Sequence, residues 1–316
     1  MNIPSISKFL AHLKTCGRRH AMALLIGFAT LATASSAFAQ YKYSSIDYPG
    51  GVATTIRGVN NHGDMVGGYR VPGQPRHALL VKDGKFIPMA PTTVLGTNYS
   101  EAFKINDRGD SVGRYISDDG VVHGYLLTSK GVLTTLDFPT ASETLANGID
   151  ESGTVVGWWD ILDADGNLLA QQGFMWEKGN FSEVNLPGSA KTAVWANNAR
   201  GNLVGSWGPD LNLPDHGFVT SKNQFISFDA PFPGGSFTVA GGINASAEIV
   251  GQYNDADGFP HGFLAMGATF TSLDYPGALI TTAWGINSAG QIVGNWYDSS
   301  FTVHGFLAQP DKKGKP

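Results

Sequence analysis

Cysteine is nearly absent from this chain of 316 residues, because Cys16 is the only one. It lies in an amino-terminal segment that we expect to be removed. The mature protein would then have no disulfide, no thiol nucleophile and no cysteine metal ligand. Helical periodicity is missing after residue 40. No Gly-x-Ser-x-Gly elbow, His-Glu-x-x-His motif, phosphate loop or dinucleotide fingerprint occurs, so no local motif indicates an enzyme class.

Residues 1–39 have the pattern of a signal peptide. The segment carries four basic and no acidic residues, namely Lys8, Lys14, Arg18 and Arg19. An apolar run over 21–32 and the small-x-small triplet Ala37-Phe38-Ala39 follow. We expect cleavage after Ala39 and a secreted or periplasmic bacterial protein. An uncleaved anchor is the alternative, although the apolar run is short for a membrane span.

The mature chain is acidic. Removing four basic residues leaves 17 Lys and Arg against 26 Asp and Glu, a net charge of −9. A chain of this charge with no basic run is a poor partner for nucleic acid or for an anionic membrane. We expect a monomer with no membrane span in the mature chain.

A fixed-period repeat organises residues 40–316, which we expect to form a single domain. Its landmark is a glycine after an apolar pair, found at Gly67, Gly113, Gly157, Gly205, Gly251 and Gly294. The intervals are 46, 44, 48, 46 and 43 residues. Seven residues earlier stands an Asn or Asp, namely Asn60, Asn106, Asp150, Asn198, Asn244 and Asn287. An aromatic residue always follows two positions after the landmark, and a His-Gly-aromatic step comes later in most copies.

Each copy contains four short apolar runs with β-branched and aromatic residues, separated by turn residues. In the last full copy the predicted strands are 270–275, 281–286, 291–296 and 304–308. Four strands in about 45 residues predict a β-propeller blade. The sequence therefore predicts an all-β, six-bladed propeller with four-stranded blades. The strand near 43–46 would supply the fourth strand of the last blade and close the ring. An open β-solenoid is the alternative.

Three irregular segments break the repeat: 91–100, 160–172 and 208–214. We expect them to be loops, which often carry binding specificity. The pairs Asp163-x-Asp165-Gly166 and Asp255-x-Asp257-Gly258 resemble fragments of calcium loops, but turn chemistry is the simpler interpretation because neither has the full ligand set.

The combination of His-Gly-Phe with the upstream Asn-x-x-Gly-x-Ile-Val-Gly resembles the HAF-repeat family of secreted bacterial proteins. His77-Ala78 keeps the first two letters of the His-Ala-Phe step for which that family is named, and the other copies have glycine in the middle. The resemblance covers essentially the whole mature chain. It implies secretion and a repeat fold, and it implies no reaction or catalytic residue.

One repeat position varies while the rest stay constant. Three residues before each Asn or Asp the chain has Arg57, Phe103, Asn147, Trp195, Gly241 and Trp284. If the strand before Asn-x-x-Gly is innermost, these residues recur at one level around the axis. We predict a ligand-binding channel mouth formed by Arg57, Phe103, Asn147, Trp195 and Trp284, with ordinary packing as the alternative. The repeated histidines are expected to be structural and to bond backbone within their own blades.

The function predicted from these features is binding, with a glycan or cell-envelope component as ligand. The alternative is a hydrolase, lactonase or lyase with a metal ion in the central channel, so whether the protein is an enzyme stays open. No catalytic residue, metal ligand or cofactor is predicted, although calcium is compatible with the sequence.

Overall fold

The computed structural model describes residues 41–89, 99–222 and 224–311. The expected signal peptide, most of the irregular segment 91–100 and the last five residues lie outside these ranges. Throughout the described ranges the regular elements are strands, β1 to β24, and none is a helix. The all-β prediction is confirmed.

Four sheets have four strands each. The first contains β2 (Ala53–Val59), β3 (Met65–Arg70), β4 (His77–Lys82) and β5 (Lys85–Pro88). The second contains β6 (Tyr99–Ile105), β7 (Ser111–Ile116), β8 (Val122–Leu127) and β9 (Leu133–Leu136). The third contains β18 (Ser236–Ile243), β19 (Ile249–Asn254), β20 (Pro260–Met266) and β21 (Thr269–Leu273). The fourth contains β22 (Ile280–Ile286), β23 (Ile292–Tyr297), β24 (Val303–Pro310) and β1 (Tyr41–Ile46).

The remaining strands belong to one eight-stranded sheet, so six separate sheets are not observed. Its first half contains β10 (Glu143–Ile149), β11 (Val155–Leu162), β12 (Leu168–Glu177) and β13 (Asn180–Val184). Its second half contains β14 (Lys191–Asn197), β15 (Leu203–Gly208), β16 (His216–Ser221) and β17 (Gln224–Phe228). The halves join through a single parallel pair, Gln171 with Lys191. Neighbouring sets are also linked at this place elsewhere, because Ser100 N–H donates to Arg76 O and Thr238 N–H donates to Asp215 O.

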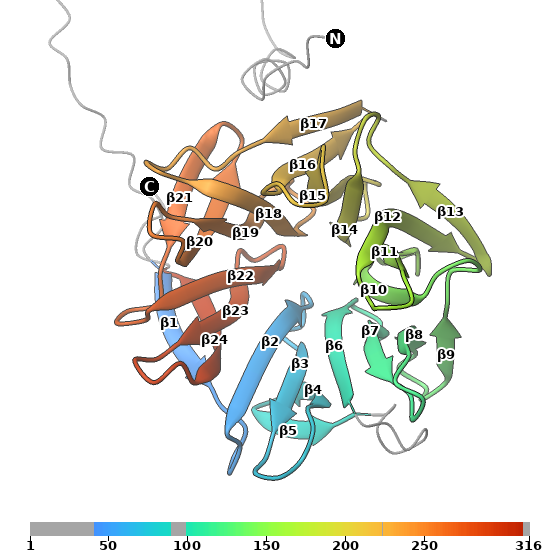
Figure 1. The fold of residues 1–316 in the computed structure, drawn as a ribbon. Helices are drawn as coiled ribbons and strands as arrows, with labels where there is room; N and C mark the ends of the chain where they lie inside the picture. Colours follow the sequence, from blue (N-terminus) through green and yellow to red (C-terminus); the bar gives the residue numbers. More distant parts are fainter. Residues whose placement is uncertain (1–40, 90–98, 223, 312–316) are drawn as a thin grey trace, which may run out of the picture.

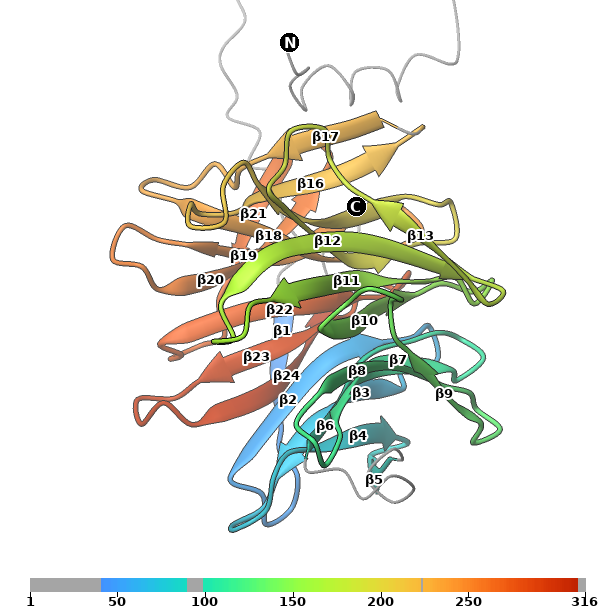
Figure 2. The same ribbon diagram turned by 45° about the vertical axis from the view of Figure 1, so that its right-hand side comes forward.

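The strands radiate from a common centre as a β-propeller with four-stranded blades (Figure 1). The strands β2, β6, β10, β14, β18 and β22 lie nearest the centre, and the later strands of each set lie progressively outward (Figures 1 and 2). The first strand of the chain pairs antiparallel with the last, from Tyr41 opposite Pro310 to Ile46 opposite Gly305.

Antiparallel order places the connections on two faces. The Asn-x-x-Gly turns follow the innermost strands and form what we call the asparagine face. The hairpins between the second and third strands lie at the opposite end, where the innermost strands begin. Backbone bonds confirm this, because Ser142 and Thr238 donate to the carbonyls of Asp160 and Asp215. We call this opposite end the mouth face.

Each landmark glycine lies where a side chain has no room. A Cβ at Gly251 would come 2.0 Å from the carbonyl oxygen of Val239 and 2.7 Å from the ring of Phe263. Phe263 is the aromatic residue of a His-Gly-aromatic step and is fully buried. The glycine and the aromatic residue of one copy are thus a fitted pair, which explains why both recur.

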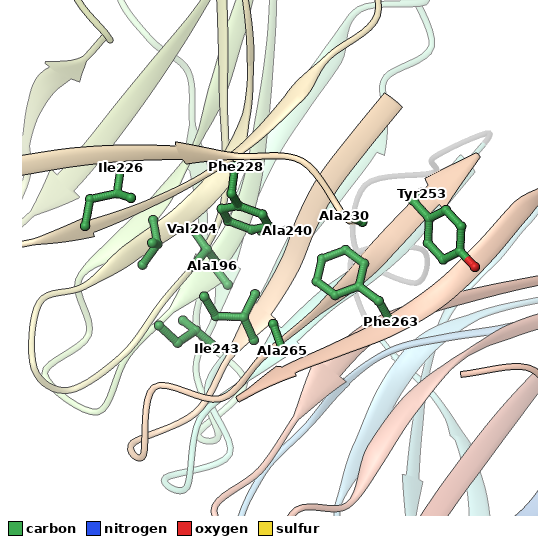
Figure 3. Close-up of a cluster of buried hydrophobic side chains, with 12 residues drawn as sticks. Ala196, Val204, Ile226, Phe228, Ala230, Ala240, Ile243, Tyr253, Phe263 and Ala265 are labelled. Atoms are coloured by element: carbon green, nitrogen blue, oxygen red, sulfur yellow. The ribbon is translucent and has the colours of Figure 1, made fainter. Parts of the chain in front are cut away.

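The hydrophobic core lies within and between the blades. Figure 3 shows one cluster, in which Phe228 from β17 and Phe263 from β20 pack with aliphatic residues of neighbouring strands. Burial of each such large side chain contributes about 1.5–3 kcal/mol. The core is therefore distributed around the ring.

The predicted strands of the last copy agree with β21 to β24 within about two residues at each end. The prediction of a loop over 160–172 is wrong, because β11 and β12 extend through most of it. Only Asp163–Asn167 forms a turn, in which Asp163 Oδ1 accepts the backbone N–H groups of Asp165 and Asn167. Asp255 caps the equivalent turn before Phe259 in the same way.

Candidate functional site

A β-bulge occurs at the same place in all six innermost strands. In β2 the pairing register skips from Ile56 to Gly58 and leaves Arg57 unpaired. The other register shifts leave out Phe103, Asn147, Trp195, Gly241 and Trp284. These are the residues that the sequence placed at one level around the axis. A bulge re-aims a side chain, so the predicted position has a structural cause that the sequence pattern did not reveal.

Arg57 is the central cation of this ring. Its guanidinium carbon lies 4.7 Å from the ring centroid of Trp284 and 5.4 Å from that of Phe103. Its Nε atom is 3.5 Å from Glu101 Oε1, and the side chain is 21% exposed. Cation–π contact with two aromatic rings holds the guanidinium in place, while part of the side chain remains exposed to solvent.

Glu101 is the buried counter-ion of the mouth. It is 2% exposed, and it accepts hydrogen bonds from the Thr55 hydroxyl at 2.7 Å and the Tyr99 hydroxyl at 3.0 Å. Burial alone would raise the pKa of Glu101, but Arg57, Arg76, Thr55 and Arg114 outweigh it and lower the pKa to about 2. Three arginines around one carboxylate leave a cationic excess at this level.

Three tryptophans continue the site from the axis. The ring centroids of Trp195 and Trp284 are 5.0 Å apart, and those of Trp158 and Trp195 are 4.5 Å apart. The indole N–H groups of Trp195 and Trp284 donate to Ser206 and Thr282. Trp195 is partly exposed, whereas Trp158 and Trp284 are buried. The mouth is therefore closed by packed side chains, and Trp195 is the indole that faces solvent.

Asn147 does not join this cluster as an accessible group. It is 1% exposed, and its Nδ2 donates to Leu145 O within its own strand at 3.2 Å. The structure therefore brings together Arg57, Phe103, Trp195 and Trp284, and places Asn147 inside the wall. The arginine–glutamate group, including Glu101, was missed by the sequence reasoning. The sequence signal that could have found it is the carboxylate of Glu101, two residues before the variable position Phe103.

Lys104 was also missed, and it crosses the axis. Its equivalents in the other copies are Gly or Ala, namely Gly58, Gly148, Ala196, Gly242 and Gly285. The ammonium donates to the carbonyl oxygens of Trp284, Gly241 and Arg57 at 2.6, 3.0 and 3.2 Å. Burial and the charge of Arg57 lower the pKa of Lys104 to about 7. The lysine of one blade thus ties together the innermost strands of three others.

A cavity of about 110 Å³ lies on the asparagine side of Lys104. The repeated asparagines surround it and perform two tasks. The Oδ1 atom of Asn244 accepts the backbone N–H groups of Ser246 and Glu248 in its turn. Its Nδ2 donates to Asn287 O of the next copy, and Asn287 donates to Asn60 O. The same link is missing only from Asp150 to Asn198, because a carboxylate has no N–H to donate.

Four of the five repeated histidines bond carboxylates, so the expectation of a backbone partner is wrong for His123, His216, His261 and His304. Nδ1 of His261 is 2.7 Å from Asp274 and Nδ1 of His304 is 2.7 Å from Asp47. His304 also stacks on Trp296 with centroids 4.3 Å apart. These contacts lie within or between neighbouring strands, which supports a structural role for the histidines.

Among the described residues, no group of three or more His, Cys, Asp or Glu side chains is arranged to hold a metal ion. Within the same parts of the chain, no helix has the length and apolar character needed to cross a membrane.

No protein-family model and no curated protein matches the chain. Solved structures do match. A mutant of the Aleuria aurantia lectin in complex with α-methyl-L-fucoside is 10% identical, with 87% of this chain and 96% of that chain covered, at a TM-score of 0.50. The SapL1 lectin in complex with α-methyl fucoside is 11% identical, with 81% and 92% covered, at a TM-score of 0.50. At this identity the likeness shows the fold alone, which is a propeller with four-stranded blades.

Proposed function

We propose that this protein is a secreted or periplasmic binding propeller whose mouth face holds a carbohydrate or cell-envelope ligand. The observation that carries the proposal is Arg57, whose guanidinium lies within cation–π distance of Trp284 and Phe103 and whose side chain is still 21% exposed. A planar cation beside the partly exposed indole of Trp195 offers an ion pair and a stacking surface to one ligand.

The charge of the mouth selects an acidic sugar. Arg57, Arg76 and Arg114 face the single carboxylate of Glu101, so two positive charges are left over at the mouth of an otherwise acidic chain. A uronate presents a carboxylate to these arginines and an apolar ring face to Trp195. The two lectins of similar fold were solved with fucosides, which is compatible with a sugar ligand here.

The proposal includes the architecture that the repeat predicts. Counting the two halves of the eight-stranded sheet as separate blades gives six, and the pairing of β1 with β24 supports closure of the ring by the amino-terminal strand. Cleavage after Ala39, membership of the HAF-repeat family and a monomeric state are part of the same proposal. Amino-terminal sequencing and sedimentation of the exported protein test them.

Calorimetric titration with oligosaccharides tests the ligand. We expect oligouronates to bind and neutral oligosaccharides of the same length to bind at least about tenfold more weakly, which corresponds to about 1.4 kcal/mol. Arg57→Gln and Trp195→Ala should each weaken uronate binding. Arg200→Gln, at an exposed arginine on the asparagine face, is the matched control and should not. Equal binding of both sugars, or equal effects of Arg57→Gln and Arg200→Gln, would contradict the proposal.

A second candidate function, a hydrolase or lyase, rests on Asp160. Burial raises the pKa of this carboxyl to about 6, and Glu143 lies directly opposite it in the β10–β11 ladder. A carboxylic acid that is protonated near neutral pH can act as a general acid. A hydrolase or lyase with a metal ion in the channel would need carboxylates at the axis. Among the described residues Glu101 lies there, and its carboxylate is already paired with arginines. Elemental analysis, melting with chelator and Asp160→Asn in a glycoside and lactone screen test both forms.

A further inference from the structure

Large apolar side chains are exposed mainly on the mouth face. Of the ten such side chains among the described residues, seven lie in its hairpins and loops: Val52, Val121, Leu169, Leu213, Phe259, Leu279 and Phe301. Five of these seven are in hairpins between the second and third strands of a set, one residue per hairpin. Singly exposed apolar residues are ordinary, but seven of ten on one face point to an interaction surface there.

Phe301 is the most informative of these residues. It is 62% exposed, and its φ of 60° lies in the left-handed region. The equivalent hairpins have glycine at this place, with Gly166 at φ 81° and Gly258 at φ 84°. A non-glycine residue there costs about 1–2 kcal/mol. Because Phe301 is mostly exposed and holds a strained backbone conformation, we read its presence as a sign of binding rather than of folding.

The same five hairpins are acidic. The segments 117–121, 163–169, 209–215, 255–259 and 298–302 contain nine Asp and no Lys or Arg. Asp119 and Asp257 each come two residues before the apolar residue of their hairpin in the sequence, whereas Asp215 is ion-paired with Lys191. The hairpins between third and fourth strands, on the asparagine face, carry Lys130, Lys178 and Lys222 together with Asp83, and the sixth hairpin of the mouth face, 71–76, carries Arg76 and no Asp. The hairpins of the two faces therefore differ in charge, and the five acidic ones also carry the apolar tips.

We propose that the rim formed by these five hairpins docks a basic polypeptide whose Lys or Arg side chains alternate with apolar ones. Charge complementarity favours this occupant. A flat anionic lipid surface would meet the carboxylates of the rim and could not reach the arginines at the axis, as a single sugar can. A second copy placed face to face would set one acidic rim against another. This inference is independent of the sugar proposed for the mouth, because it rests on the rim and not on Arg57.

The probe is a synthetic amphipathic Lys/Leu peptide, measured by fluorescence anisotropy at low and high salt. A Glu/Leu peptide and a Lys/Ser peptide of the same length separate charge from apolar contact. The test variant is Phe301→Gly with Phe259→Ser. Phe301→Gly also relieves the left-handed strain, so the variant should not lose folding stability. The matched control is Val132→Ser with Met266→Ser, two exposed side chains in hairpins of the asparagine face.

We expect the Lys/Leu peptide to bind, the other two peptides to bind weakly, and salt to weaken the complex. The rim variant should lose about tenfold in affinity, whereas the control variant should stay within about twofold of the wild type. Equal effects of the two variants, or equal binding of Lys/Ser, would overturn the proposal. Self-association that Phe301→Gly abolishes would also overturn the proposal, because a second copy would then be the occupant. Binding of the protein to zwitterionic vesicles would overturn it as well. Uronate binding should survive in the rim variant, so failure of the two proposals can be told apart.

Discussion

Replacing Lys104 by Met should change how the stability of the propeller depends on pH. Lys104 is the only basic residue in a ring of Gly and Ala, and its ammonium reaches three backbone carbonyls across the axis. Methionine fills a similar volume, but it has neither the charge nor the donors. The variant therefore removes two opposing contributions at once.

The two contributions have similar size at neutral pH. Three hydrogen bonds at about 1 kcal/mol net each contribute about 3 kcal/mol. Against this, burial and Arg57 lower the pKa of Lys104 from 10.5 to about 7, and that shift corresponds to about 5 kcal/mol. At pH 7 we therefore expect the variant to be at least as stable as the wild type, with a difference within about 2 kcal/mol.

The difference should reverse as the pH rises. Between pH 7 and about 10 the unfolded chain keeps the lysine proton while the folded protein has released it. The cost of burying the charge is thus fully present below pH 7 and disappears towards pH 10. Wild-type stability should gain up to about 1.4 kcal/mol per pH unit relative to the variant. At pH 10 the folded protein holds a neutral amine, which has two N–H groups to donate, so the variant should be less stable by about 2 kcal/mol.

Urea unfolding followed by tryptophan fluorescence measures these values, since Trp195 and Trp284 lie at the axis. Lys85→Met, at an exposed lysine, is the matched control and should follow the wild type at every pH. If the difference in the free energy of unfolding between wild type and the Lys104 variant is constant from pH 7 to 10, the three carbonyls keep Lys104 protonated over this range. That result would refute the reasoning.

Three further predictions concern stability. Asp150→Asn should raise the free energy of unfolding by about 1 kcal/mol, because its new N–H group can donate to Asn198 O as the asparagines of the other copies do. Asp150→Ala should lower the free energy of unfolding. Equal melting temperatures of the two variants would contradict this prediction. The lowered pKa of Glu101 contributes about 3 kcal/mol of stability, which is fully present above pH 4.5 and is lost as the pH falls towards 2. Acid unfolding of Glu101→Gln should not show this loss of stability. Ala247→Gly should stabilise the folded protein by about 1 kcal/mol, because Ala247 has a φ of 62°. Gly251→Ala should prevent folding, because its Cβ would meet a carbonyl oxygen at 2.0 Å. Thermal melting measures both effects, and a folded Gly251→Ala variant would refute the packing argument.

The sequence by itself determined the local structure of this protein. Strand bounds, the all-β class and the four-stranded blade followed from a regular pattern of apolar runs, turn residues and landmark glycines. Such features depend on contacts within one repeat, where Asn-x-x-Gly fixes the turn and Gly251 fits Phe263. Even the level of Arg57 and Trp284 around the axis could be read, because equivalent positions in repeats arranged around one axis recur at one height.

Only the tertiary structure decided which side chains meet across repeats. The bulge in each innermost strand aims Arg57 at Glu101 of the next set, and no periodicity reports a bulge. Lys104 lies in one repeat and its carbonyl partners lie in three others. The same holds for His304 and Asp47, which are far apart in the chain. Side-chain reach and direction at the crowded axis determine these contacts, and both depend on the curvature that all the blades create together.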